Sequence, residues 1–133
     1  MQKKYMKYYH SKTIHGEFET VRNHVTDALK SIGFGIISTI DVSAALKDKI
    51  GVDYKPYLIL GACNPGFAYQ ALQIEEMLGV ILPCNVVLID QGNGNIEVAA
   101  MHPSELILAM GKPELIAITE AVSESIAGLI DNL

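Results

Sequence analysis

Regularly spaced apolar residues predict two long amphipathic helices, one in each half of the chain. Between Glu17 and Ile32 the apolar side chains recur every three or four positions and form one stripe: Phe18, Val21, Val25, Leu29 and Ile32. From Pro113 onward the same spacing repeats: Leu115, Ile118, Val122, Ile126, Leu129 and Leu133. Gly33 follows the first stripe, at the place where a left-handed glycine commonly ends a helix. We expect each helix to bury one face.

Short runs rich in β-branched and aromatic residues predict strands. These runs are Tyr5 to Ile14, Phe34 to Ile40, Tyr54 to Ala62, Val80 to Asp90 and Ile96 to Met101. The turn Gln91-Gly92-Asn93-Gly94-Asn95 joins the last two and is typical of a β-hairpin. A hairpin pairs its strands antiparallel, so a purely parallel, doubly wound sheet is excluded.

Capping residues predict three further helices. Asp41 to Ser43 supplies N-capping side chains for a helix from Ala44 to Ile50. Asn64 is an N-cap with Pro65 in the first helical position, and Gly79 ends that helix. His102-Pro103 opens a short helix that ends near Gly111. The order β-α-β-α-β-α-β-β-α-α predicts an α+β fold, with a mixed, mainly antiparallel curved sheet of about five strands and helices packed on one face.

Composition favours one domain that spans residues 1–133. Half of the residues are hydrophobic and 19% are charged, which suits a single packed core. We find no apolar run near the ~20 residues that a membrane-spanning helix needs. The N-terminus also lacks the apolar core of a signal peptide. We therefore expect a cytoplasmic protein with no membrane partner.

The net charge of −5 is unevenly distributed along the chain. Lys3, Lys4, Lys7 and Lys12 lie among the first 14 residues, which contain no acid. This basic segment is also rich in tyrosine, a combination that occurs in nucleic-acid-binding proteins. The acidic remainder would repel phosphates. We interpret the segment as an edge strand kept soluble by lysines, and we expect no nucleic-acid partner.

Two phrases, together with the order of elements, resemble a known family. One is Pro56-Tyr57-Leu58-Ile59-Leu60-Gly61-Ala62-Cys63-Asn64-Pro65, and the other is Leu82-Pro83-Cys84-Asn85-Val86-Val87. Gly33-Phe34-Gly35, followed by Ile40-Asp41-Val42, adds to the likeness. Together they resemble the bacterial and archaeal domain of unknown function 302.

The resemblance implies a fold similar to that of the TATA-binding-protein class and a homodimer, and it implies no settled activity. The likeness of fold carries no inference about DNA binding. Glu75 falls where such proteins often have a glutamate. His102 stands where an aspartate is usual, so a role for an acid at that position is not carried over.

Cys63 and Cys84 are the residues with the most chemical interest. Cys63 is next to a predicted helix N-terminus, where backbone N–H groups stabilise a thiolate. Such a cysteine can be a nucleophile, a sulfur carrier or a soft-metal ligand, but a free cysteine is most often a small buried hydrophobe. Cys84, inside an apolar run, is by itself a core residue. The two could form a redox pair if the fold brings them together. No histidine shows ligand spacing, so we expect no metal site.

Glu75 is a third catalytic candidate. A carboxylate near an apolar helix face can have a raised pKa and act as an acid or base. The alternative is a partly exposed residue, or an ion pair across a dimer. The two asparagines have structural explanations, since Asn64 caps a helix and Asn85 could bond a neighbouring loop. Gly61 to Gly66 lacks the Lys-Ser/Thr of a phosphate-binding loop.

The hypothesis that we favour is a homodimeric small-ligand-binding protein that is not an enzyme. Its pocket lies near the Gly61–Gly66 junction and Cys84, where an apolar molecule, an anionic molecule or a haem-like group would be suitable; the sequence names no cofactor. The predicted ligand-binding residues are Cys63, Asn64, Pro65, Cys84 and Asn85. One alternative is a thiol-based redox or sulfur-transfer protein that uses Cys63 and Cys84. Another is a structural dimerisation domain.

Overall fold

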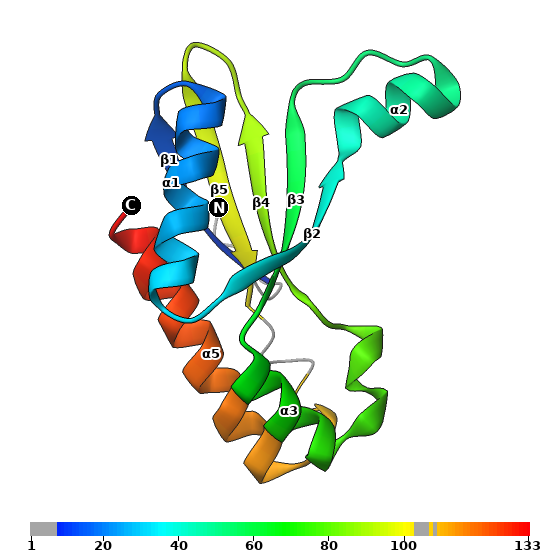
Figure 1. The fold of residues 1–133 in the computed structure, drawn as a ribbon, viewed down its shortest axis with the longest axis vertical. Coiled ribbons are helices and arrows are strands. Elements are labelled where there is room, and N and C mark those ends of the chain that lie inside the picture. The colour runs from blue at the N-terminus through cyan, green and yellow to red at the C-terminus, as the bar shows by residue number, and fades with distance from the viewer. Residues whose placement is uncertain (1–7, 103–106, 108) are drawn as a thin grey trace, which may run out of the picture.

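Five strands form a single sheet in this computed structural model, which describes residues 8–102, 107 and 109–133. The strands are β1 (Tyr9–His15), β2 (Gly35–Asp41), β3 (Tyr57–Cys63), β4 (Cys84–Asp90) and β5 (Asn95–Met101). Their order across the sheet is β1-β5-β4-β3-β2 (Figure 1). Every neighbouring pair is antiparallel. The predicted α+β class is confirmed, and β1 is an edge strand as expected.

Two long helices cover one face of this sheet. They are α1 (Phe18–Ser31) and α5 (Pro113–Asp131), and both follow the predicted apolar stripes. The short helix α2 (Val42–Ile50) and the helix α3 (Pro65–Ile74) lie at opposite ends of the sheet (Figure 1). The predicted order of strands and helices is confirmed. The expected helix at His102-Pro103 falls largely on residues 103–106 and 108, outside the described part of the chain.

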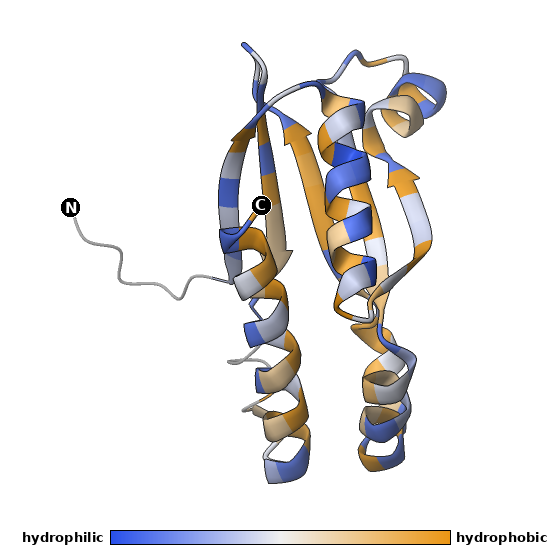
Figure 2. Ribbon diagram, turned by 60° about the vertical axis from the view of Figure 1, so that its left-hand side comes forward, coloured by the Kyte–Doolittle hydropathy of each residue, from blue (hydrophilic) through white to orange (hydrophobic). Residues whose placement is uncertain are grey.

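The main core lies between the sheet and the two long helices. Alternate residues of β3, β4 and β5 face it, because side chains of a strand alternate between the two faces. The buried set is Val21, Val25, Leu29, Phe34, Leu58, Leu60, Ala62, Val86, Leu88, Ile96, Val98, Ala100, Ile126 and Ile130. Figure 2 shows the hydrophobic strands behind α1, whose surface turned away from the sheet is mostly hydrophilic. Burial of the two stripes thus fixes both helices on this face.

A row of apolar side chains crosses the opposite face of the sheet, which none of the described helices covers. Ile40, Ile59, Val87 and Ala99 follow one another across four strands in the pairing register. They alternate with core residues and therefore lie on the second face. Ile40 is 51% exposed. Exposure along this row is uneven, because Ile59 and Val87 are half-buried and Ala99 is buried.

The predicted helix from Pro65 to Gly79 is divided in the structure. Glu75 is extended, with φ −143° and ψ 100°, and ends α3. A 3-10 helix, η1 (Glu76–Val80), follows, and the Glu75 carboxylate accepts a hydrogen bond from the Met77 N–H at 3.0 Å. The next strand therefore begins at Cys84 rather than at Val80. Within the described residues, no helix is both long and apolar enough to cross a bilayer.

Candidate functional site: an apolar cavity at the end of the sheet

The junction between β3 and α3 is built as the capping pattern predicts. Asn64 is extended, and its side-chain Oδ1 accepts a hydrogen bond from the Phe67 N–H at 3.2 Å. Pro65 occupies the first helical turn, where its missing N–H costs nothing. A Cβ on Gly33, whose φ is +90°, would lie 2.9 Å from Asn64 Nδ2. Glycine at this position therefore leaves room for the capping side chain.

Gly61 permits a close approach on the second face of the sheet. A Cβ at this position would overlap the hydroxyl of Ser38 and lie 2.8 Å from Cγ of Pro83. Ser38 belongs to β2, and Pro83 directly precedes β4. The absence of a side chain at Gly61 thus lets two neighbouring segments close over β3. The glycine of the junction serves packing rather than phosphate binding.

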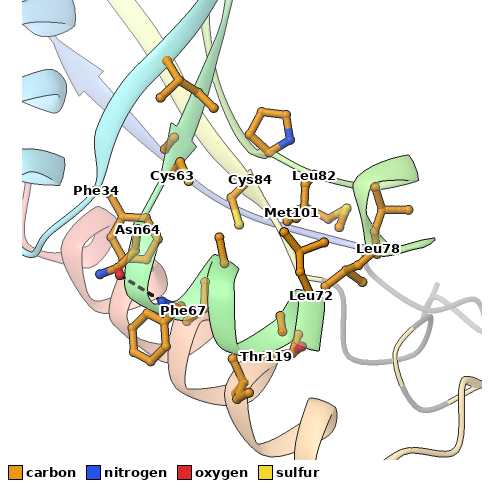
Figure 3. A pocket seen from close by; sticks show the side chains of 18 of the residues that line it. Phe34, Cys63, Asn64, Phe67, Leu72, Leu78, Leu82, Cys84, Met101 and Thr119 are labelled. Carbon is orange, nitrogen blue, oxygen red and sulfur yellow. Dashed lines mark hydrogen bonds between the residues drawn. The ribbon is translucent and has the colours of Figure 1, made fainter. Parts of the chain in front are cut away.

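A cavity of about 390 Å³ lies beside this junction. Its walls come from the sheet end, α3, η1, the segment before β4 and α5 (Figure 3). The described lining residues are Phe34, Ile37, Ala62, Cys63, Asn64, Phe67, Ala68, Ala71, Leu72, Leu78, Ile81, Leu82, Pro83, Cys84, Met101, Ile107, Ile118, Thr119 and Val122. None of them is charged, and their polar groups are one amide, one hydroxyl and two thiols. The cavity is therefore a strongly apolar site.

The cavity lies between two hydrophobic clusters. The main core lies on one side, and a smaller cluster of Ala71, Leu78, Ile107 and Leu115 lies on the other. Helix α5 is long enough to reach both clusters, because Ile126 and Ile130 belong to the core and Leu115 to the smaller cluster. The intervening part of α5 therefore faces the cavity.

Cys63 and Cys84 both line this cavity (Figure 3). They come from neighbouring strands, and Cys84 is opposite Ala62 in the register of β3 and β4. Burial raises the pKa of the Cys84 thiol, and the nearby Cys63 raises it further. Both cysteines are free thiols and are partly buried. The fold thus brings together the two cysteines that the sequence singled out.

The other predicted ligand-binding residues do not share one site. Asn64 lines the cavity together with the two cysteines. Pro65 begins α3 and is not among the described lining residues. Asn85 lies on the second face of the sheet, opposite Gly61, and lines a separate groove there. The predicted set therefore does not form one constellation.

Glu75 makes an ion pair rather than facing an apolar surface. Its carboxylate lies 2.8 Å from Nζ of Lys112. The hydrogen bond from Lys112, followed by that from the Met77 N–H, lowers the pKa of Glu75 below its usual value. Of the two interpretations of Glu75, the raised pKa is contradicted, and the structure shows an ion pair. The partner is Lys112, 37 positions away in the same chain, and not a residue across a dimer. The contact with Lys112 is therefore a structural one, since it joins the end of α3 to the start of α5.

Comparison with known proteins decides the family. A family model described as "Domain of unknown function DUF302" matches residues 10–133. The chain belongs to the DUF302 family. The match includes α5, which the sequence phrases did not reach.

A solved structure supports this assignment. It is the crystal structure of an uncharacterized conserved protein DUF302 from Bacillus stearothermophilus, which is 27% identical to this chain. The superposition has a TM-score of 0.85 and covers 95% of this chain and 98% of that one. No curated protein matches. The family therefore supports the fold, while the function has to be argued from the site.

Sequence reasoning missed several residues that line the cavity of this DUF302 protein. Ile118, Thr119 and Val122 on α5 form one wall, and Met101 at the end of β5 contributes to another. The apolar positions of α5 belong to a single stripe, which does not distinguish a core contact from a cavity wall. The one local signal was Thr119, a polar residue next to that stripe.

A groove on the second face of the sheet adjoins the cavity. Its volume is about 430 Å³. The described residues that line it are Tyr8, Tyr9, Tyr57, Ile81, Pro83, Asn85, Val87, Ile89, Glu97, Ala99, Ala100 and Met101. Ile81, Pro83 and Met101 line both spaces. These three residues therefore form the boundary between cavity and groove.

The described residues offer no conventional metal site. No group of three or more histidine, cysteine, aspartate or glutamate side chains among them could hold a metal ion. Two cysteines supply only half of the ligands of a closed zinc site. The chemistry available in the cavity is therefore apolar contact together with two thiols, an amide and a hydroxyl.

Proposed function

We propose that this DUF302 protein binds a small molecule whose apolar, uncharged part occupies the cavity between β3, α3 and α5. The supporting observation is the lining itself, since a space of about 390 Å³ is bounded by side chains of which none, among the described residues, is charged. Ligand sites typically have this size and combine apolar walls with a few polar groups. Asn64 and Thr119 provide such groups here, as hydrogen-bonding partners for one polar atom of the ligand.

The sequence suggested three types of ligand, and the lack of charged side chains among the described lining residues favours one of them. A buried charge is costly unless an opposite charge or several hydrogen bonds compensate it. An anionic molecule would meet no cation among the described lining residues. The acidic groups of a haem-like molecule would also meet no cation if the molecule lay wholly inside the cavity. The apolar option therefore has the best support.

The test is binding of N-phenyl-1-naphthylamine, an uncharged apolar dye whose fluorescence increases in apolar surroundings. We expect saturable binding with one site per chain. Ala68→Phe should fill the cavity, because Ala68 is half-buried on α3 and lines it. We expect at least a tenfold loss of dye affinity in this variant. Val122→Phe, which acts from α5, provides a second obstruction should the first variant fold poorly.

Ala45→Phe is the matched control. It introduces the same side chain at an exposed position of α2, far from the lining residues. We expect its dye affinity to equal that of the wild type. Melting curves of all variants separate a filled cavity from a damaged fold. Non-saturable fluorescence, or equal affinity in every folded variant, would refute the proposal.

A thiol-based redox or sulfur-transfer function is the second candidate. It is supported by the presence of both thiols in one cavity, which is a requirement for a redox pair. The raised pKa of Cys84 weighs against it, because less of this thiol is ionised at neutral pH and the thiolate is the reactive form. Rapid, reversible disulfide formation between the two cysteines on mild oxidation would favour this candidate over the first.

A further inference from the structure

We propose that the ligand is amphipathic, with an apolar chain in the cavity and a neutral or cationic head group in the groove on the second face of the sheet. This inference rests on the proposed function, since it identifies the class of molecule that the cavity binds. It adds a second subsite, formed by the groove, and it specifies the charge of the group that the groove accepts.

The adjacency of the two spaces supports a ligand that occupies both. Ile81, Pro83 and Met101 line the cavity on one side and the groove on the other. Met101 is 42% exposed, and methionine is unbranched with three rotatable bonds, so its side chain adapts to a neighbour at low cost. A chain that passes over Met101 would connect the two spaces. The groove adds about 430 Å³ to the available volume.

The chemistry of the walls differs between the spaces and fixes the orientation of the ligand. The cavity is apolar, whereas Tyr8, Tyr57, Asn85 and Glu97 bring hydroxyl, amide and carboxylate groups to the groove. Tyrosine has an apolar ring and a polar tip, which suits the boundary between a chain and its head group. An apolar chain is therefore favoured in the cavity, and the polar end of the molecule in the groove.

Glu97 determines the charge that the head group can carry. It pairs with Ile89 across the strands, and Tyr57 follows Ile89 in the same row on the second face. Its Oε1 accepts a hydrogen bond from Nε2 of Gln91 at 2.9 Å. A carboxylate has about four acceptor sites, so capacity remains for a ligand donor. No lysine, arginine or histidine is among the described residues lining the groove. An ammonium, hydroxyl or amide head is favoured, and a carboxylate or phosphate is repelled.

Displacement of N-phenyl-1-naphthylamine by matched molecules tests this inference. The competitors are dodecylamine, 1-dodecanol, dodecanoate and butylamine, each used below its aggregation limit. We expect dodecylamine and 1-dodecanol to displace the dye, and dodecanoate to bind at least tenfold more weakly. Butylamine should not displace the dye, because it has the head group without the long apolar chain. Ala68→Phe should weaken the binding of dodecylamine as well as the binding of the dye.

Glu97→Gln isolates the head-group subsite. It keeps a hydrogen-bond acceptor and removes the charge. We expect the wild type to bind dodecylamine more tightly than 1-dodecanol, and this preference to fall about tenfold in the variant. Dye affinity is measured in the same variant, so that each competitor can be compared with it. Glu124→Gln, at an exposed position of α5, is the matched control and should behave as the wild type.

The possible outcomes separate the two proposals. Absence of saturable dye binding overturns the proposed function itself. Dye binding without discrimination between dodecylamine and dodecanoate overturns only the present inference. A change in molecular mass by light scattering in Glu97→Gln, together with altered binding, would show that copies of the chain meet at the groove, and would overturn the head-group subsite. Loss of the preference for dodecylamine in Glu97→Gln, without a change in molecular mass, supports the head-group subsite.

Discussion

The ammonium group of Lys112 lies 2.8 Å from the carboxylate of Glu75 and joins two segments 37 residues apart. The same ammonium group donates a hydrogen bond to the carbonyl oxygen of Ile74 at 3.2 Å. One cation therefore satisfies the C-terminal end of α3 and holds η1 against the start of α5. Because η1 carries Leu78, a lining residue, this ion pair helps to fix one wall of the cavity.

Replacement of Glu75 by glutamine should change how stability depends on pH. Contacts with Lys112 and the Met77 N–H lower the pKa of Glu75 in the folded state from its usual 4.5. The contribution of these contacts to the free energy of unfolding is therefore complete above the usual pKa of Glu75. It is lost as the pH falls through the lowered pKa of the folded state. The melting temperature of the wild type should fall more steeply than that of Glu75→Gln between about pH 5 and about pH 3.

Glu76→Gln is the control for this measurement, since Glu76 is exposed and adjacent. Its pH profile should match that of the wild type. Added salt should reduce the difference between Glu75→Gln and the wild type, because screening weakens a partly exposed ion pair. Parallel pH profiles for the wild type and Glu75→Gln would contradict the assignment of the lowered pKa to this contact.

The Cys84 thiol should react with iodoacetamide more slowly than an ordinary thiol in the native protein. Burial and the neighbouring Cys63 raise the pKa of Cys84, so Cys84 should need a higher pH for alkylation than an ordinary thiol. Cys63→Ser removes the second cause and leaves the first. We expect a modest shift of the Cys84 profile to lower pH, measured by mass spectrometry. In denaturant the profile should become that of a free thiol, and a native profile already identical to it would exclude the burial effect.

Truncation of the α1 stripe should test the burial of its core-facing side. Leu29 is fully buried, whereas Ile32 is 38% exposed. Leu29→Ala should lower the free energy of unfolding by about 2–5 kcal/mol, because it leaves a cavity in the core. Ile32→Ala should cost less than about 1 kcal/mol. Urea denaturation of the two variants measures the difference, and similar losses would contradict the orientation of α1.

The homodimer expected from the family resemblance remains a prediction, and the second face of the sheet provides a place to test it. Ile40 and Ile59 are cross-strand partners on that face and are not among the described residues lining the groove. Light scattering should give twice the 14.5 kDa mass of one chain. Ile59→Lys should shift the protein toward the monomer, whereas Thr20→Lys on exposed α1 should not. A monomeric wild type would rule the prediction out.

Local patterns were sufficient for most of the elements. The stripes of α1 and α5, the Asp41 cap of α2 and the Asn64-Pro65 start of α3 all occur where the sequence predicts them. Each depends on contacts within a few residues or on one regular spacing. The end of α3 at Glu75 was missed because it is stabilised from outside the segment, by Lys112.

The sequence by itself determined that helices α1 and α5 have apolar faces, that β4 and β5 form a hairpin, and that Cys63 lies beside a helix start. Tertiary structure alone decided that Cys63 and Cys84 line one cavity, that Asn85 faces a different space, and that Glu75 is paired. The physical reason is the distance along the sequence over which each interaction acts. Capping and amphipathicity act over a few residues, whereas a cavity forms where α5 extends past the end of the sheet, between two hydrophobic clusters distant in sequence.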